Sequence, residues 1–248
     1  MRWKGNMRLN KLNSVAGLLL TAVAVVAAGC QSTGKSTPAA VGPTTKQMQA
    51  SMTPQLALAE LRAGNERFVS GKPFHRNFAA SAKASASGQY PFAVVLSCLD
   101  SRQPIEIVLD QGIGDIFSAR VAGNVLNDDI LGSMEFGCKV SGAKLIAVIG
   151  HSNCGAIKGA IDDVELGNLT ELLNKIKPAM DMVAADALPR TSKNYSFVDA
   201  VAEANVRLVM QQIRDRSPVL REMLDRGEIG LVGGMYDLET GKVRFFEN

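Results

Sequence analysis

Residues 91–97, "PFAVVLS", form an almost continuous apolar run, and this run decides the fold class. A strand covered on both faces has such a run, whereas a strand with one solvated face alternates apolar and polar residues. Residues 143–150, "AKLIAVIG", show the pattern most clearly, and residues 115–122, "DIFSARVA", show a weaker version. We therefore predict at least three strands, of which the first and third are buried.

Helical patterns separate and follow these strands. A first helix is expected to begin after the capping residue Thr53, with Pro54 in its first turn, and to end near Gly71. A second is expected over residues 127–142, where Asn and Asp precede the apolar residues. The remaining predicted elements are long helical patterns in 169–187 and 197–227, a strand in 229–238 and its hairpin partner in 241–246.

Alternation of strands and helices predicts the fold class. It is typical of an α/β fold with a mainly parallel β-sheet flanked by helices. The helix after Thr53 precedes the first strand and would form an N-terminal helical arm. In sheets of this kind, ligands bind beyond the carboxyl ends of the strands.

The composition excludes some classes of function. The 248 residues are 46% hydrophobic and 21% charged, which suits one globular domain with an appendage. The net charge of +3 comes from the first 29 residues, which hold four basic side chains and no acidic one. With aromatic residues at only 5% and no basic stripe, the sequence does not predict a nucleic-acid partner.

Residues 1–29 have the pattern of a signal peptide. A basic start precedes the apolar stretch 15–28, which is shorter than the roughly 20 residues that a membrane-spanning helix needs. Cleavage before Cys30 would resemble bacterial lipoprotein processing and place a lipid on Cys30. We therefore expect an exported protein of the bacterial cell envelope, lipid-anchored and facing the periplasm. The alternatives are a soluble periplasmic protein and a short uncleaved anchor.

The sequence after the signal divides into a tether and a folded domain. Residues 30–50 are rich in Ser, Thr, Gly and Pro and have no periodic apolar face, so a flexible tether is expected there. Residues 51–248 are expected to form the functional domain.

Two of the predicted strands end in residues that can bind a metal. "SCLDSR" (97–102) follows the first strand and "GHSNCG" (150–155) the third. Two cysteines and one histidine leave one tetrahedral position open, which is typical of catalytic zinc. A disulfide is the alternative in an exported protein, and spacing alone leaves both open. Cys138 is expected to be a small buried hydrophobic residue.

The surroundings of these motifs resemble a known family. "CLDSR" and "HSNC", with Cys98 and His151 53 residues apart, are similar to the β-class carbonic anhydrases. The likeness continues through "LRAGNERFVSGKPFH", "DQGIGDIFSARVAGN", "NVRLVMQQIRDRSPVLREML" and "GEIGLVGGMYDLETGKVRF". It covers nearly all of residues 55–246.

The resemblance implies roles for individual residues. One Zn²⁺ per chain would be bound by Cys98, His151 and Cys154, and Asp100 with Arg102 would form the catalytic dyad. Asp100 could also be the fourth zinc ligand in a closed state. The implied substrate-binding residues are Gln89, near the carbon dioxide oxygen, and Phe117, Val121 and Ala122, around a small apolar pocket.

The resemblance also implies the reaction and the assembly. A zinc-bound hydroxide, oriented by the Asp100–Arg102 dyad, would attack carbon dioxide and give bicarbonate and a proton, reversibly. Members of the family form dimers or larger assemblies, so a homodimer or homotetramer is expected.

Three other functions remain open at this point. A zinc hydrolase of carbon disulfide or carbonyl sulfide would use the same metal and dyad. A metal-free thiol enzyme would use Cys154 as nucleophile and His151 as base, and would leave Cys98 and Asp100 without roles. A non-catalytic, envelope-attached zinc-binding module would need the ligands alone.

Overall fold

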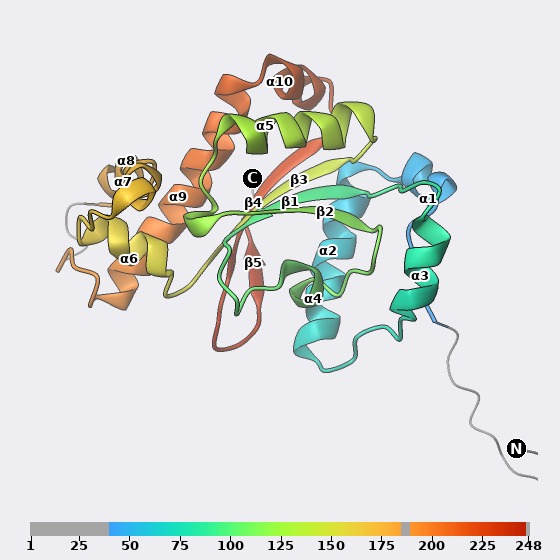
Figure 1. Ribbon diagram of the computed structural model, residues 1–248, viewed down its shortest axis with the longest axis horizontal. Coiled ribbons are helices and arrows are strands. Elements are labelled where there is room, and N and C mark those ends of the chain that lie inside the picture. Colours follow the sequence, from blue (N-terminus) through green and yellow to red (C-terminus); the bar gives the residue numbers. More distant parts are fainter. Residues whose placement is uncertain (1–39, 185–188, 247–248) are drawn as a thin grey trace, which may run out of the picture. The chain divides into compact units, whose positions relative to one another are not determined.

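The apolar runs form the centre of a five-stranded sheet (Figure 1). In the computed structural model, which describes residues 40–184 and 189–246, the strand order is β2-β1-β3-β4-β5. The strands are β1 (Ala93–Ser97), β2 (Ile116–Arg120), β3 (Leu145–His151), β4 (Gly230–Tyr236) and β5 (Val243–Phe245). The first four are parallel and β5 is antiparallel to β4, which confirms the predicted α/β fold and its terminal hairpin.

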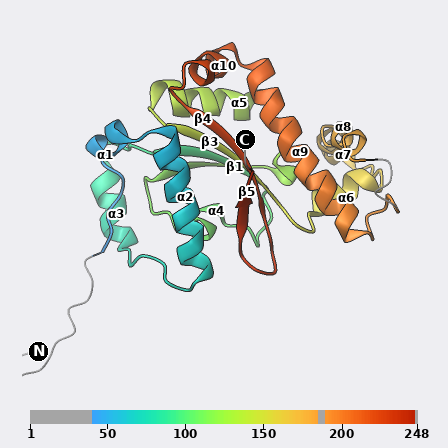
Figure 2. The same ribbon diagram turned by 180° about the vertical axis from the view of Figure 1, so that it is seen from behind.

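Helices cover both faces of the sheet (Figure 2). One face packs against α5 (Asp128–Glu135), the π-helical turn η2 (Phe136–Val140), α9 (Tyr195–Arg216) and α10 (Pro218–Asp225). The other packs against α2 (Pro54–Val69) and α4 (Ile105–Val108). Successive side chains of a strand point to opposite faces, so Val94 and Leu96 enter the first core and Ala93 and Val95 the second.

A third apolar cluster lies beyond the carboxyl ends of β1 and β3. It joins the amino-terminal half of α9 to α6 (Gly155–Ile161), α7 (Gly167–Asn174) and α8 (Lys177–Asp181). Cys98 and Cys154 belong to this cluster, together with large buried residues such as Phe197 and Ile176. Both cysteines therefore lie in a packed and buried part of the molecule.

Local capping signals located the start of two helices correctly. The Thr53 side chain accepts a hydrogen bond from the backbone N–H of Leu56, and Pro54 is the first residue of α2. Asn127 caps α5 in the same way by accepting from the N–H of Ile130. The helix predicted over 127–142 is α5 continued by η2, and it stops before Gly142, whose φ of +83° favours glycine.

The two long helical patterns are each divided, which the prediction missed. Residues 197–227 contain α9 and α10, because Pro218 holds the preceding Ser217 in extended backbone, where its hydroxyl caps α10. Residues 169–187 overlap α7 and α8, and Pro178 lies in the first turn of α8. The end of that predicted pattern, residues 185–187, lies outside the described residues.

The amino-terminal part of the domain is more ordered than predicted. Helix α3 (Phe78–Ser85), capped by Asn77, occupies a stretch for which no element was expected. Helix α1 (Lys46–Ser51) lies inside the predicted tether, and Asp115 accepts hydrogen bonds of 2.8 Å from the N–H and hydroxyl of Thr44. The tether prediction is therefore wrong for residues 44–50.

The predictions for the start of the chain fall outside the described residues. They are the signal peptide of residues 1–29, the lipid on Cys30 and the first part of the tether. In the ranges 40–184 and 189–246, no helix is both long enough and apolar enough to cross a membrane.

Candidate metal centre

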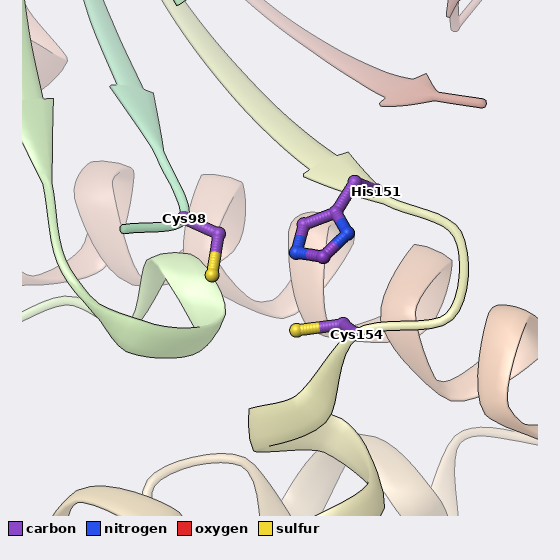
Figure 3. Close-up of side chains that lie close together, drawn as sticks. All are labelled: Cys98, His151 and Cys154. Carbon is purple, nitrogen blue, oxygen red and sulfur yellow. The ribbon is translucent and has the colours of Figure 1, made fainter. Parts of the chain in front are cut away.

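The two ligand motifs meet at one edge of the sheet (Figure 3). Strands β1 and β3 are parallel neighbours with Ser97 opposite Ile149, so Cys98 and His151 emerge at the same end. A short turn after His151 then brings Cys154 to the start of α6. The candidate ligand atoms of Cys98, His151 and Cys154 all lie within 4.8 Å of one another, and all three residues are buried.

The imidazole of His151 is oriented as a metal ligand. Its Nδ1 lies 2.9 Å from the carbonyl oxygen of Ser152, which can only accept, so Nδ1 carries the proton. Its Nε2 then presents a lone pair, and this buried atom has no hydrogen-bond partner in the described part of the chain. A buried lone pair without a donor, with the other ring nitrogen fixed by a carbonyl, is typical of a histidine that binds metal.

The two thiols influence each other's ionisation. The neighbouring Cys154 thiol lowers the pKa of Cys98 to about 4, although burial opposes this. The interaction with Cys98, together with burial, raises the pKa of Cys154. Cys98, Cys138 and Cys154 are free thiols, so the structure does not support the disulfide alternative. Two sulfurs and one imidazole nitrogen fit zinc, with a fourth tetrahedral position left for another ligand.

Asp100 is held ionised beside this group. Its Oδ1 accepts hydrogen bonds of 2.9 Å from the backbone N–H and the Nε of Arg102, and its Oδ2 accepts one of 2.7 Å from Nη2. These bonds keep the pKa of Asp100 well below its usual range. The same Oδ2 lies 3.8 Å from Nε2 of His151. The structure thus places a fixed anionic oxygen at the edge of the candidate metal centre.

Arg120, which the sequence analysis missed, holds the loop that carries these residues. It is the last residue of β2, and its Nε and Nη2 donate to the carbonyl oxygens of Cys98, at 3.1 Å, and of Asp100, at 2.6 Å. Its position at the carboxyl end of a strand could have revealed it, because Cys98 and His151 were also found at the carboxyl ends of parallel strands.

Val121 and Ala122 lie beside the candidate metal centre. Val121 packs against the apolar cluster that contains Cys98 and Cys154, and Ala122 begins the short turn η1 (Ala122–Asn124). Gly123 follows with a φ of +62°, and its N–H donates to Cys98 Sγ at 3.3 Å. A Cβ on Gly123 would lie only 2.7 Å from Ile176, so this close approach requires glycine.

Gln89 and Phe117 are not brought to the metal centre within one chain. Phe117 pairs with Val94, which precedes Cys98 by four residues, or about 13 Å along a strand. Its ring packs edge-on against Phe136, with the ring centroids 6.2 Å apart. Gln89 precedes β1 and therefore lies at the end of the strand opposite Cys98. Within a single chain, these two residues therefore do not lie beside the candidate metal centre.

Comparisons with known proteins agree with this geometry. The family model described as carbonic anhydrase matches residues 93–243. Carbonic anhydrase 2 of Mycobacterium tuberculosis is 35% identical over 190 residues, covering 76% of this chain and 91% of that protein. The carbonic anhydrase of Mycolicibacterium smegmatis is 35% identical over 191 residues, covering 77% and 92%.

Solved structures extend the agreement to the fold. The β-carbonic anhydrase CcaA superposes with a TM-score of 0.62 at 23% identity, covering 77% of this chain and 95% of that one, which shows a shared fold. The β-carbonic anhydrase CafA of Aspergillus fumigatus gives a TM-score of 0.61 at 26% identity, covering 78% and 90%. The chain therefore belongs to the carbonic anhydrase family, in its β class.

Proposed function

We propose that this chain catalyses the reversible hydration of carbon dioxide to bicarbonate and a proton, with one zinc ion per chain. β-Carbonic anhydrases use zinc, and Cys98, His151 and Cys154 would hold it. The observation that carries the proposal is the convergence of three buried soft ligands with the fixed Asp100 carboxylate at their edge.

The zinc ligands, Asp100 and Arg102 have different roles in the proposed reaction. Zinc, when bound by these ligands, lowers the pKa of water and makes hydroxide available near neutral pH. Asp100 Oδ2 accepts a hydrogen bond from the O–H of the attacking oxygen, which aims a lone pair of that oxygen at the carbon of the substrate. Arg102 fixes Asp100 for this task, because its hydrogen bonds occupy both carboxylate oxygens from one side. This arrangement is preorganised and costs no reorientation during the reaction.

Carbon dioxide and carbonyl sulfide are distinguished by a direct comparison of turnover. Both substrates would use the same ligands and dyad, so the structure alone does not separate them. We expect zinc-loaded protein to hydrate carbon dioxide with a much larger kcat/KM than that for hydrolysis of carbonyl sulfide or carbon disulfide. A larger kcat/KM for either sulfur compound would replace the proposed reaction with the hydrolase.

The metal-free thiol enzyme, with Cys154 as nucleophile and His151 as base, would leave Cys98 and Asp100 without roles, although both lie at the same site. A non-catalytic zinc module would leave the Asp100–Arg102 pair without a role, although the pair faces the ligands.

We also propose that a second copy of the chain completes the substrate site. Gln89 and Phe117 are at the far end of β1 from their own metal centre, so they can reach a metal centre only in another chain. Strand β2 is at the edge of the sheet, and the 51% exposed Phe136 packs against Phe117, so this side of the molecule is suited to contact with a second copy. Two β-carbonic anhydrases of Sordaria macrospora, which share the fold, are tetrameric.

Co-expression of two defective chains tests this assembly. Gln89→Ala and Cys98→Ser each impair every site of their own homo-oligomer. In a mixed dimer, one site would pair an intact Gln89 with an intact Cys98 from the other chain, so we expect activity above the mean of the two parents. Activity equal to that mean would show that Gln89 acts within its own chain or not at all.

For the start of the chain, we propose export by residues 1–29 and a lipid on Cys30, facing the periplasm of a bacterial envelope. The sequence pattern supports this, and residues 30–43 would remain as the tether before Thr44 joins the domain. Mass spectrometry of the native amino terminus should find a diacylglycerol on Cys30. An unmodified terminus near residue 30 would indicate the soluble periplasmic form, and an intact residue 1 the uncleaved anchor.

A further inference from the structure

Helix α9 contacts the loop that carries His151 and Cys154, and also the turn whose N–H donates to Cys98. We propose that two of its side chains, Asp199 and Asn205, are positioning residues that fix these loops and thereby set how long the site retains its metal. The inference rests on the proposed zinc site and concerns residues that touch neither metal nor substrate.

Asp199 fixes the turn between His151 and Cys154. Its Oδ1 accepts a hydrogen bond of 2.8 Å from the backbone N–H of Asn153, the residue directly before Cys154. Asn153 has a φ of +54°, in the left-handed region that residues other than glycine rarely adopt. A side-chain acceptor at this N–H therefore stabilises the backbone shape that presents both ligands to one point.

Asn205 fixes the turn that contacts Cys98. Its Nδ2 donates a hydrogen bond of 2.8 Å to the carbonyl oxygen of Gly123. The N–H of the same residue, Gly123, donates to Cys98 Sγ. Asn205 is only 1% exposed, so water does not compete for this bond. The position of one sulfur ligand's hydrogen-bond donor is thus set by a side chain of α9.

The helix is suited to this role because it is firmly anchored. Nine of its 22 residues are buried, and it packs against β3, β4 and α8. Asp199 and Asn205 are six residues apart, or about 9 Å along a helix. Two loops that are distant in sequence are therefore held in place by hydrogen bonds to the same helix. Groups hydrogen-bonded directly to metal ligands typically change metal affinity by about 10- to 100-fold when removed, and we expect the lower end of this range for residues that act through the backbone.

The test compares zinc release from carboxylate variants on the same helix. Asp199→Ala removes the acceptor, and Asp199→Asn keeps an oxygen acceptor without the charge. The control is Asp215→Ala, which removes an exposed carboxylate of α9 that makes no hydrogen bond in the described part of the chain. Transfer of zinc to an excess of a coloured chelator is followed for each purified, zinc-loaded protein. We expect about tenfold faster release from Asp199→Ala, a smaller change in Asp199→Asn, and release within about twofold of the wild type in Asp215→Ala.

A second readout separates positioning from general stability. Melting temperatures are measured with and without zinc, because a ligand that binds only the folded state raises the melting temperature according to its affinity. We expect Asp199→Ala to reduce the zinc-induced increase while leaving the metal-free protein close to the wild type. Equal losses with and without zinc, or release like that of Asp215→Ala, would overturn the proposal.

The outcome is distinguishable from a failure of the proposed function. Zinc release and melting involve no turnover, so a wild-type protein that holds zinc but does not hydrate carbon dioxide would refute the reaction and leave these measurements decisive. Because Asn205 is fully buried and its variants risk misfolding, the Asp199 series alone decides the proposal.

Discussion

Cys98→Ser is expected to abolish both zinc retention and carbon dioxide hydration. The thiol of Cys98 has a pKa lowered to about 4 and is a soft anionic ligand near neutral pH. A serine hydroxyl of similar size stays protonated there and is a poor ligand for zinc. With two of the three protein ligands left, we expect zinc to fall from one equivalent to less than about half an equivalent per chain. Elemental analysis and a stopped-flow hydration assay on the same sample measure both effects.

Cys138→Ser is the matched control for this substitution. Cys138 is as buried as Cys98, but it packs in the apolar core between the sheet and α5, and burial raises its pKa to about 12. Its replacement should lower the free energy of unfolding by about 1–3 kcal/mol, since a buried hydroxyl would need a hydrogen-bond partner, and leave the zinc content at one. Full zinc content and wild-type hydration in Cys98→Ser would remove Cys98 from the proposed ligand set.

Asp100→Asn is expected to lower kcat/KM for hydration by about 10²- to 10⁴-fold, the usual range for a positioned proton-accepting group, while zinc stays bound. The amide has the same shape but no negative charge. Because the N–H and Nε of Arg102 both donate to Oδ1, the amide oxygen is favoured at that position and the NH₂ group, which only donates, faces the attacking O–H. The orientation of the attacking O–H is therefore lost, whereas the ligand residues are untouched. Hydration kinetics on zinc-analysed protein provide the measurement.

Asp163→Asn is a suitable control for loss of a paired carboxylate. Asp163 forms an ion pair with Lys177 on the surface, where such pairs contribute little. Its replacement should leave kcat/KM unchanged. If Asp100→Asn kept the wild-type rate with full zinc content, Asp100 would be a structural partner of Arg102 only.

The pH dependence of hydration tests whether protonation of Asp100 limits the rate. Because hydrogen bonds from Arg102 hold its pKa below the usual range, Asp100 remains ionised throughout the neutral and mildly acidic range. Loss of activity between about pH 8 and pH 6 would then reflect the water or the zinc ligands, not protonation of this carboxylate.

The candidate ligands were predictable because they follow parallel strands directly. Cys98 directly follows β1 and His151 is the last residue of β3, and parallel neighbours end at the same edge of a sheet. The same rule explains why Gln89 lies far from the metal centre of its own chain. It is nine residues before Cys98, and β1 fills the space between them, so one chain places them at opposite ends of a strand.

Contacts between residues that are far apart in the sequence could not be predicted from the sequence. Asp199 and Asn205 contact loops 46 and 82 residues away, and these contacts exist only because α9 crosses the end of the sheet. Thr44 is bonded to Asp115 across 71 residues, so composition alone placed it in a tether. The division at Pro218 was a local signal, and it was readable from the sequence.

The most direct test of the central claim is a titration of metal-free protein, lacking residues 1–29, with zinc while carbon dioxide hydration is followed. We predict that the rate rises in proportion to bound zinc and reaches its plateau at one zinc per chain, as expected for the single Cys98–His151–Cys154 centre. Hydration without zinc, or a chain that holds one zinc and leaves the uncatalysed rate unchanged, would contradict the account.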